Sequence, residues 1–167
     1  MKTSRIGIEL IKEFESLHDG DLKLPGLQPK MDPVGIWTEG YGHAIRDSKG
    51  NFVKGAENKA LAYKLSKIKT PEQAIIQLIA DLEIREYIIM QKVKVPLNQN
   101  QFDALISYVY NTGGSSTLYN LINKKASKSD IQNWIENHYI TGQGSKKPLA
   151  GLVRRRKAES RLFFTPI

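Results

Sequence analysis

Three residues in the first quarter of the chain have the types and spacing that acid–base chemistry requires. Glu15 closes a run of residues at helical spacing, and Asp32 and Thr38 lie six positions apart in the stretch DPVGIWTEGYGH. A carboxylic acid that keeps its proton can protonate a leaving group, while an ionised Asp beside a hydroxyl can hold and polarise water. Together, these side chains would suit glycoside hydrolysis, which needs two carboxyl groups.

Glu15 belongs to the first predicted helix, which covers about residues 4–17 with Thr3 or Ser4 as its cap. One apolar line on this helix consists of Ile6, Leu10, Phe14 and Leu17, and a second line consists of Ile8, Ile11 and Glu15. Apolar neighbours disfavour the charged form of a carboxylate, so Glu15 is a candidate general acid. A boundary glutamate that simply reaches solvent is the alternative.

Asp32 and Thr38 are predicted to share one face of a strand, because residues an even number apart point the same way. Gly35 between them allows a turn or bulge that brings them closer. The other interpretation is a turn aspartate followed by an ordinary strand threonine. Gly40 and Gly42 are expected where the backbone bends sharply or another group approaches closely.

The rest of the pattern predicts a mostly α protein with one small β-containing region, an α+β fold. An irregular segment at 18–33 precedes an antiparallel sheet at 34–53. Thr70-Pro71 with Gln73, and Asn98 with Gln101, are start signals for helices. Further helices are predicted at about 56–66, 70–93, 98–113, 115–124, 129–138 and 149–164.

Composition narrows the possible classes of protein. The chain has 167 residues, 40% of them hydrophobic, which suits one domain or two small lobes and excludes disorder. It has no cysteine, which excludes disulfides and thiol nucleophiles. The start, MKTSRIGIELIKEFES, is too charged for a signal peptide, so we expect synthesis into a cytoplasm. The net charge of +8 implies an acidic partner: nucleic acid, anionic lipid or a bacterial wall.

Four blocks of sequence, in this order, resemble the T-even-type phage lysozymes, the endolysins of glycoside hydrolase family 24. The blocks are IKEFES around Glu15, DPVGIWTEGYGH, PLNQNQFDALISYVYNTG at 96–113 and GLVRRRKAESRLF at 151–163. The resemblance covers nearly the whole chain. It implies a lysozyme-like fold with a catalytic cleft between two lobes.

The lobes that the resemblance implies can be placed on this chain. A small β-containing lobe would cover about 18–69, and a long helix at about 71–93 would connect it to a helical lobe. The helical lobe would comprise about 94–167 together with the N-terminal helix at 4–17.

The resemblance also implies an activity, a muramidase that cleaves the β-1,4 bond between N-acetylmuramic acid and N-acetylglucosamine with inversion. Glu15 would be the general acid, Asp32 would activate water, and Thr38 would orient that water. The carboxyl groups of an inverting enzyme lie roughly 6.5–9.5 Å apart. No cofactor is expected.

The expected partner is bacterial peptidoglycan, with no nucleic acid and no stable membrane association, and the expected state is a monomer. The protein would stay in the host bacterial cytoplasm until a holin opens a route to the cell wall. It would then release phage by lysing the host cell.

The sequence departs from the family between its two acids. Sixteen residues separate Glu15 from Asp32, a longer segment than the family usually has, and it supplies Asp19 and Asp21 as rival acids. Asp32 is retained because only it has a threonine at the family's spacing.

Two single residues also depart from the family. Ser16 stands where the family commonly has Gly, so the helix either ends there regardless or continues further. Glu39 replaces a usually apolar residue beside Thr38, and strand alternation predicts that it points to the opposite face.

Other residues are weaker candidates. Tyr41, Asn111 and Thr112 are predicted to bind substrate, whereas Trp37 and Tyr110 are expected in the core. The three histidines, at 18, 43 and 138, show no metal-ligand spacing, and His43 is expected to brace the hairpin through a hydrogen bond.

Two other functions compete with hydrolysis. The run Arg154-Arg155-Arg156-Lys157 and the net charge would suit a nucleic-acid-binding domain, although no helix-turn-helix spacing accompanies them. The preferred interpretation of this run is a solvated face with one arginine packed inward. The other competitor is a lysozyme-like scaffold that binds wall glycan without cutting it.

Overall fold

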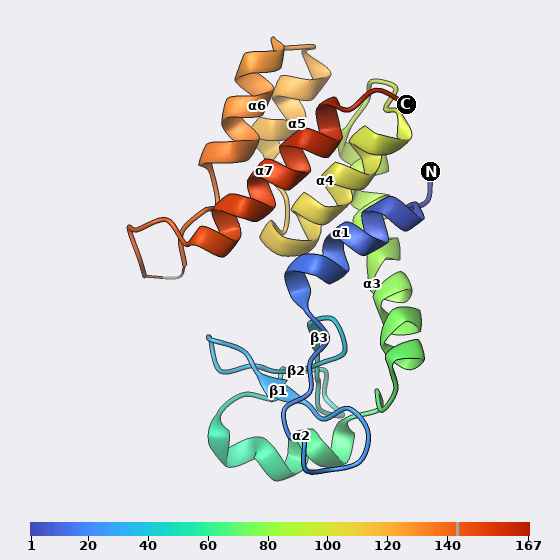
Figure 1. Cartoon of the computed structure of the whole chain (residues 1–167), viewed down its shortest axis with the longest axis vertical. Coiled ribbons are helices and arrows are strands. Elements are labelled where there is room, and N and C mark those ends of the chain that lie inside the picture. The colour runs from blue at the N-terminus through green and yellow to red at the C-terminus, as the bar shows by residue number, and fades with distance from the viewer. Residues whose placement is uncertain (143) are drawn as a thin grey trace. The chain divides into compact units, whose positions relative to one another are not determined.

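The computed structural model describes residues 1–142 and 144–167, which divide into two compact units (Figure 1). The sheet unit comprises residues 15–81, and the helical unit comprises residues 1–14 with residues 82–167. This arrangement of many helices with one small sheet confirms the predicted α+β fold.

The sheet unit is built on three short antiparallel strands. They are β1 (Lys30–Met31), β2 (Trp37–Glu39) and β3 (His43–Ala44), in the order β1-β2-β3. Lys30 pairs with Thr38, and Glu39 pairs with His43. The prediction that 18–33 is irregular is wrong at β1, because a two-residue strand is too short to produce the alternation that marks strands in sequence.

The core of the sheet unit lies behind these strands. The 3-10 helix η1 (Ala56–Asn58) and the helix α2 (Lys59–Leu65) follow the sheet, as predicted for 56–66. The buried cluster consists of Trp37, Ile45, Val53 and Ala62. Trp37 also donates from its indole nitrogen to the Gly55 carbonyl at 2.8 Å, which satisfies its one polar atom. The predicted core position of Trp37 is therefore confirmed.

Most helices begin and end within two residues of the predicted positions. They are α1 (Arg5–Glu15), α3 (Pro71–Lys92), α4 (Gln99–Thr112), α5 (Ser116–Asn123), α6 (Lys128–Asn137) and α7 (Ala150–Phe164). The predicted capping boxes form at α3 and α4: Thr70 and Gln73 bond reciprocally, and so do Asn98 and Gln101. In the helical unit, α4 packs along α7 (Figure 1).

The first helix differs from the prediction in its buried face and its end. Ser4 caps it by accepting from the Ile6 N–H, and Ile11 is fully buried, but Ile6 is 58% exposed instead of packed. The helix ends at Glu15, two residues before the predicted end, because Ser16 adopts a left-handed φ of 60°. Ser16 thus takes the conformation that glycine adopts most easily.

The sequence predicted that one arginine of the run on α7 packs inward, but two of them do. Arg155 and Arg156 are both buried, and their guanidinium groups lie 3.1 Å from the Glu159 carboxylate. Two buried cations and one carboxylate, which also accepts from Ser107, form an ionic network within the helical unit. Of the four residues of the run only Arg154 and Lys157 are exposed, so about half of its charge is presented at the surface.

Candidate active site

The sheet unit contains a pocket of about 460 Å³ that brings the predicted catalytic residues together. It is lined by Glu15, His18, Lys30, Met31, Asp32, Pro33, Thr38 and Gly42. The rival acids Asp19 and Asp21 do not line it. Asp19 instead accepts from the backbone N–H groups of Asp21 and Gln28, as a loop-stabilising residue does.

Glu15 is positioned by the end of its helix and by a glycine of the hairpin. It is the last residue of α1, and its half-buried side chain reaches Gly42. A Cβ at Gly42 would lie only 3.3 Å from Glu15 Oε2, and the φ of Gly42 is 86°. Glycine at this position therefore allows both the turn of the hairpin and the approach of the carboxylate.

Asp32 is held by the turn between β1 and β2 rather than by a strand. Its Oδ1 accepts from the N–H groups of Val34 at 2.9 Å and Ile36 at 2.8 Å. Its own N–H donates to the Ile36 carbonyl at 2.8 Å, and the Gly35 N–H donates to the Asp32 carbonyl at 3.0 Å. Both side-chain bonds use Oδ1, which leaves Oδ2 available to a ligand or a water.

Thr38 presents its hydroxyl from the middle strand. The residue is only 5% exposed, yet it lines the pocket. Its Oγ1 donates to the Lys30 carbonyl at 3.0 Å, within the β1–β2 pair. The predicted closeness of Asp32 and Thr38 thus arises from a turn and a strand pairing, not from one continuous strand.

His18 is a pocket residue that the sequence analysis left without a role. Its Nδ1 lies 2.9 Å from Thr38 Oγ1, and its backbone N–H donates to the Gly40 carbonyl at 2.8 Å. Burial lowers the pKa of His18, and the charge of Lys30 lowers it further, against the opposing charges of Glu15 and Asp32. The only signal in the sequence was its position three residues after the candidate acid.

Glu39 and His43 brace the sheet unit behind the pocket. Glu39 is buried on the side opposite the pocket, as predicted, and its Oε2 accepts from Ser66 Oγ, the Lys67 N–H and the Ile68 N–H at 2.8–3.0 Å. The predicted brace at His43 is confirmed: its Nδ1 lies 2.9 Å from an Asp81 carboxylate oxygen on α3. That hydrogen bond raises the pKa of His43.

The three predicted substrate-binding residues are not brought into this pocket. Tyr41 is only 8% exposed, which leaves little of its ring for stacking on a sugar. Asn111 and Thr112 belong to the helical unit, where Asn111 accepts from Arg156 at 2.8 Å and Thr112 donates to the Tyr108 carbonyl at 2.8 Å. Their contact with substrate stays a prediction.

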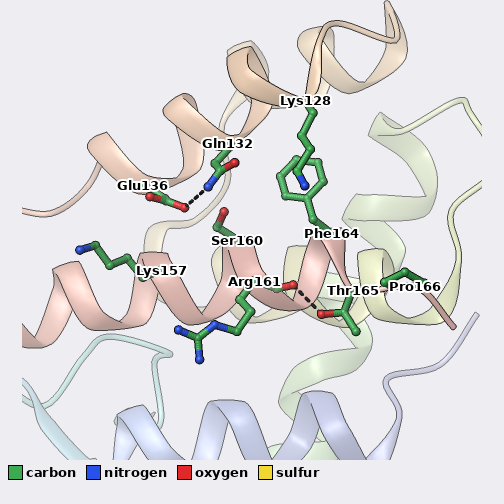
Figure 2. A pocket seen from close by; sticks show the side chains of 9 residues that line it. All are labelled: Lys128, Gln132, Glu136, Lys157, Ser160, Arg161, Phe164, Thr165 and Pro166. Atoms are coloured by element: carbon green, nitrogen blue, oxygen red, sulfur yellow. Dashed lines mark hydrogen bonds between the residues drawn. The ribbon is translucent and has the colours of Figure 1, made fainter.

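A second pocket of about 440 Å³ lies between α6 and α7, and its chemistry is different (Figure 2). Three cationic side chains, Lys128, Lys157 and Arg161, line it with a single acid, Glu136. That acid accepts from Gln132 at 2.9 Å, as Figure 2 shows. Because it lacks a second carboxylate, this pocket does not meet the requirement of two-carboxylate hydrolysis.

Two features of other site classes are absent from the described part of the chain. Across residues 1–142 and 144–167, no three His, Cys, Asp or Glu side chains gather as a metal site would require. Over the same residues, no helix combines the length and the apolar character needed to cross a membrane.

Comparison with known proteins decides the family. A family model described as phage lysozyme matches residues 23–159, a span that includes Asp32 and Thr38 and begins after Glu15. The chain belongs to the phage lysozyme family. The predicted relationship is therefore confirmed.

Individual relatives of this phage lysozyme family member extend over its whole length. It is 31% identical to an endolysin from Acyrthosiphon pisum secondary endosymbiont phage 1, over 98% of each chain. A solved endolysin from Escherichia coli O157:H7 phage FAHEc1 matches with a TM-score of 0.72 and 32% identity, over 98% of this chain and 94% of that one. The muramidase domain of SpmX from Asticaccaulis excentricus matches with a TM-score of 0.70 and 30% identity, over 99% of each chain.

Proposed function

We propose that this phage lysozyme family member is an endolysin that acts as a muramidase on bacterial peptidoglycan. It hydrolyses the β-1,4 bond between N-acetylmuramic acid and N-acetylglucosamine. The observation that carries the proposal is the single pocket lined by Glu15, Asp32 and Thr38. Relatives named endolysin and muramidase, at 30–32% identity over nearly the full chain, support the same activity.

The reaction assigns one task to each carboxyl group. Glu15, as the general acid, gives its proton to the glycosidic oxygen while the bond from that oxygen to the anomeric carbon breaks. Asp32 takes a proton from a water whose oxygen forms the new bond to the anomeric carbon from the opposite face. The products are two shorter glycan chains, one with a new N-acetylmuramic acid reducing end.

The site geometry suits these tasks. The turn around Asp32 fixes one carboxylate oxygen with two backbone donors and leaves the other for water. Thr38, anchored on the Lys30 carbonyl, offers a lone pair beside that water. A water held by two acceptors directs its own lone pair away from them, toward the sugar, and water attack on that face inverts the anomeric carbon.

We further propose that the protein works as a monomer at the cell wall and reaches it from the host cytoplasm through a lesion made by a holin. Its net charge of +8 complements anionic wall polymers and would draw it to that surface.

The test is digestion of purified peptidoglycan followed by borohydride reduction and mass analysis of the reduced sugars. A muramidase produces reduced muramic acid, whereas a glucosaminidase produces reduced glucosamine. Proton NMR in the first minutes should show the α-anomer, as inversion of a β bond requires. Binding to peptidoglycan with no new reducing ends would overturn the proposal in favour of a non-catalytic scaffold.

A further inference from the structure

The contact between His18 and Thr38 has a defined direction, because the threonine oxygen carries only one hydrogen. The Lys30 carbonyl, 3.0 Å from Thr38 Oγ1, can only accept, so the hydroxyl hydrogen belongs on that line. His18 Nδ1, 2.9 Å from the same oxygen, is then the donor, which requires the tautomer that carries the ring hydrogen on Nδ1. If the hydroxyl instead donated its hydrogen to His18, Thr38 Oγ1 and the Lys30 carbonyl oxygen would face each other at 3.0 Å with no hydrogen between them.

This arrangement fixes the remaining lone pair of Thr38 Oγ1. With one hydrogen given to Lys30 and one received from His18, the oxygen can still accept one hydrogen bond. The residue is otherwise buried and its open side is the pocket, so that lone pair is directed at the pocket. Without the imidazole, the oxygen would still donate to the Lys30 carbonyl but would have two open lone pairs, so the position of a water bound to it would no longer be fixed.

We propose that His18 is a positioning residue of this muramidase, which holds the Thr38 hydroxyl as an acceptor for the attacking water. The proposal rests on the proposed function and extends it to a residue that acts through the Thr38 hydroxyl. The backbone bond from His18 to the Gly40 carbonyl fixes the imidazole's own segment to the turn before β3. His18 is thus anchored to the same hairpin as the hydroxyl that it orients.

The charge state of His18 adds a pH-dependent readout. The charged groups around it are Lys30 on β1, Asp32 in the turn after β1 and Glu15 at the end of α1. Because burial and Lys30 lower the pKa of His18, the ring is neutral at pH 7 and gains a proton only as the pH falls below 6.5. A cation there would oppose the positive charge that develops on the sugar in the transition state.

The first experiment compares His18→Ala, His18→Asn and His138→Ala on a soluble, uncross-linked peptidoglycan glycan at pH 7. His18→Ala should lower kcat about 10- to 100-fold with little change in KM, because the water is misaligned while the sugar still binds. His18→Asn should recover most of that loss, since its amide N–H can replace Nδ1–H. His138, which lies in the helical unit and bonds the Trp134 carbonyl, is the matched control and should not change kcat.

The second experiment is a double-mutant cycle with Thr38→Val. If His18 acts only through the threonine hydroxyl, His18→Ala should have no further effect on kcat in the Thr38→Val background. A merely structural histidine would instead lower the unfolding temperature in both backgrounds and reduce activity additively. Additive losses, or wild-type kcat in His18→Ala, would overturn the proposal.

The third readout is the pH profile. As the pH is lowered below 6.5, the wild type should lose activity at a higher pH than His18→Asn, whose side chain cannot gain the proton. If the wild type and His18→Asn lost activity at the same acidic pH, the role of a neutral imidazole would be contradicted. These outcomes are separable from failure of the proposed function, in which the wild type itself would release no reducing ends.

Discussion

Two turns of the sheet unit have the same geometry and different surroundings. In one, Asp32 accepts from residues two and four positions later and Gly35 has a φ of 85°. In the other, Asp47 accepts from Lys49 and Asn51 in the same pattern, and Gly50 has a φ of 84°. Even the backbone bonds that close the two turns correspond.

The difference between the turns lies in what surrounds each carboxylate. Asp32 lines a pocket with Glu15, His18 and Thr38, whereas Asp47 is partly exposed and does not line that pocket, and its pKa is lowered mainly by the backbone N–H of Asn51. The hydrogen bonds of the turn therefore explain why each of the two positions is an aspartate. The pocket explains why only Asp32 is a catalytic candidate. An Asp-x-x-Gly spacing alone cannot distinguish a catalytic carboxylate from a structural one.

The largest effect should come from replacing the two aspartates in turn. Asparagine keeps the oxygen that accepts the two backbone bonds, so both variants should fold. Asp32→Asn should lower kcat about 10²- to 10⁴-fold, because the amide cannot take a proton from water. Asp47→Asn should keep wild-type kcat. Comparable losses in the two variants would show that the turn, not the carboxylate, is what activity requires.

The next effect concerns the brace behind the pocket and should change stability without changing turnover. Asp81→Asn removes the carboxylate partner of His43 and should destabilise the protein by about 1–3 kcal/mol at pH 5.5. The pKa of His43 is raised, so this contribution is fully present below the unfolded value of 6.5 and is lost as the pH rises through the folded pKa.

Thermal unfolding at pH 5.5 and pH 9 measures this dependence. The loss caused by Asp81→Asn should be larger at pH 5.5, and Glu83→Gln, an exposed acid on the same helix, is the control. Equal losses at the two pH values would mean that the charge on His43 does not contribute.

The smallest effect comes from the glycines of the two turns. A side chain at φ near +85° is strained, so Gly35→Ala and Gly50→Ala should each cost about 1–2 kcal/mol. Neither added methyl meets a close neighbour: the nearest atom is 3.6 Å away at Gly35, and none lies within 4 Å at Gly50. Equal losses of unfolding free energy, with kcat reduced only in Gly35→Ala, would show that only the turn with Asp32 serves catalysis. A reduced kcat in Gly50→Ala would contradict this difference between the turns.

The local parts of this structure could be predicted from sequence. Helix starts at Thr70 and Asn98 were predictable because their caps lie within four residues of the groups that they bond. The hairpin with Asp32 and Thr38 followed from one contiguous motif. These features need no knowledge of the rest of the chain.

The parts that sequence missed depend on contacts between distant segments. His18 bonds a threonine twenty positions away, and its segment has no periodicity to signal that contact. The burial of both Arg155 and Arg156 depends on Glu159 and on Ser107 of another helix. The early end of α1 depends on Ser16 adopting a left-handed conformation that its residue type does not favour.

The most direct test of the central claim is the release of N-acetylmuramic acid reducing ends from peptidoglycan by Glu15→Gln and Glu13→Gln. Both residues lie in the last turn of α1, but Glu13 is exposed and only Glu15 lines the pocket. Glu15→Gln should fold normally and lose activity about 10²- to 10⁴-fold, because the amide has no proton to give to the leaving oxygen. Glu13→Gln should match the wild type. Wild-type release by Glu15→Gln would contradict its assignment as the general acid and with it the catalytic role of this pocket.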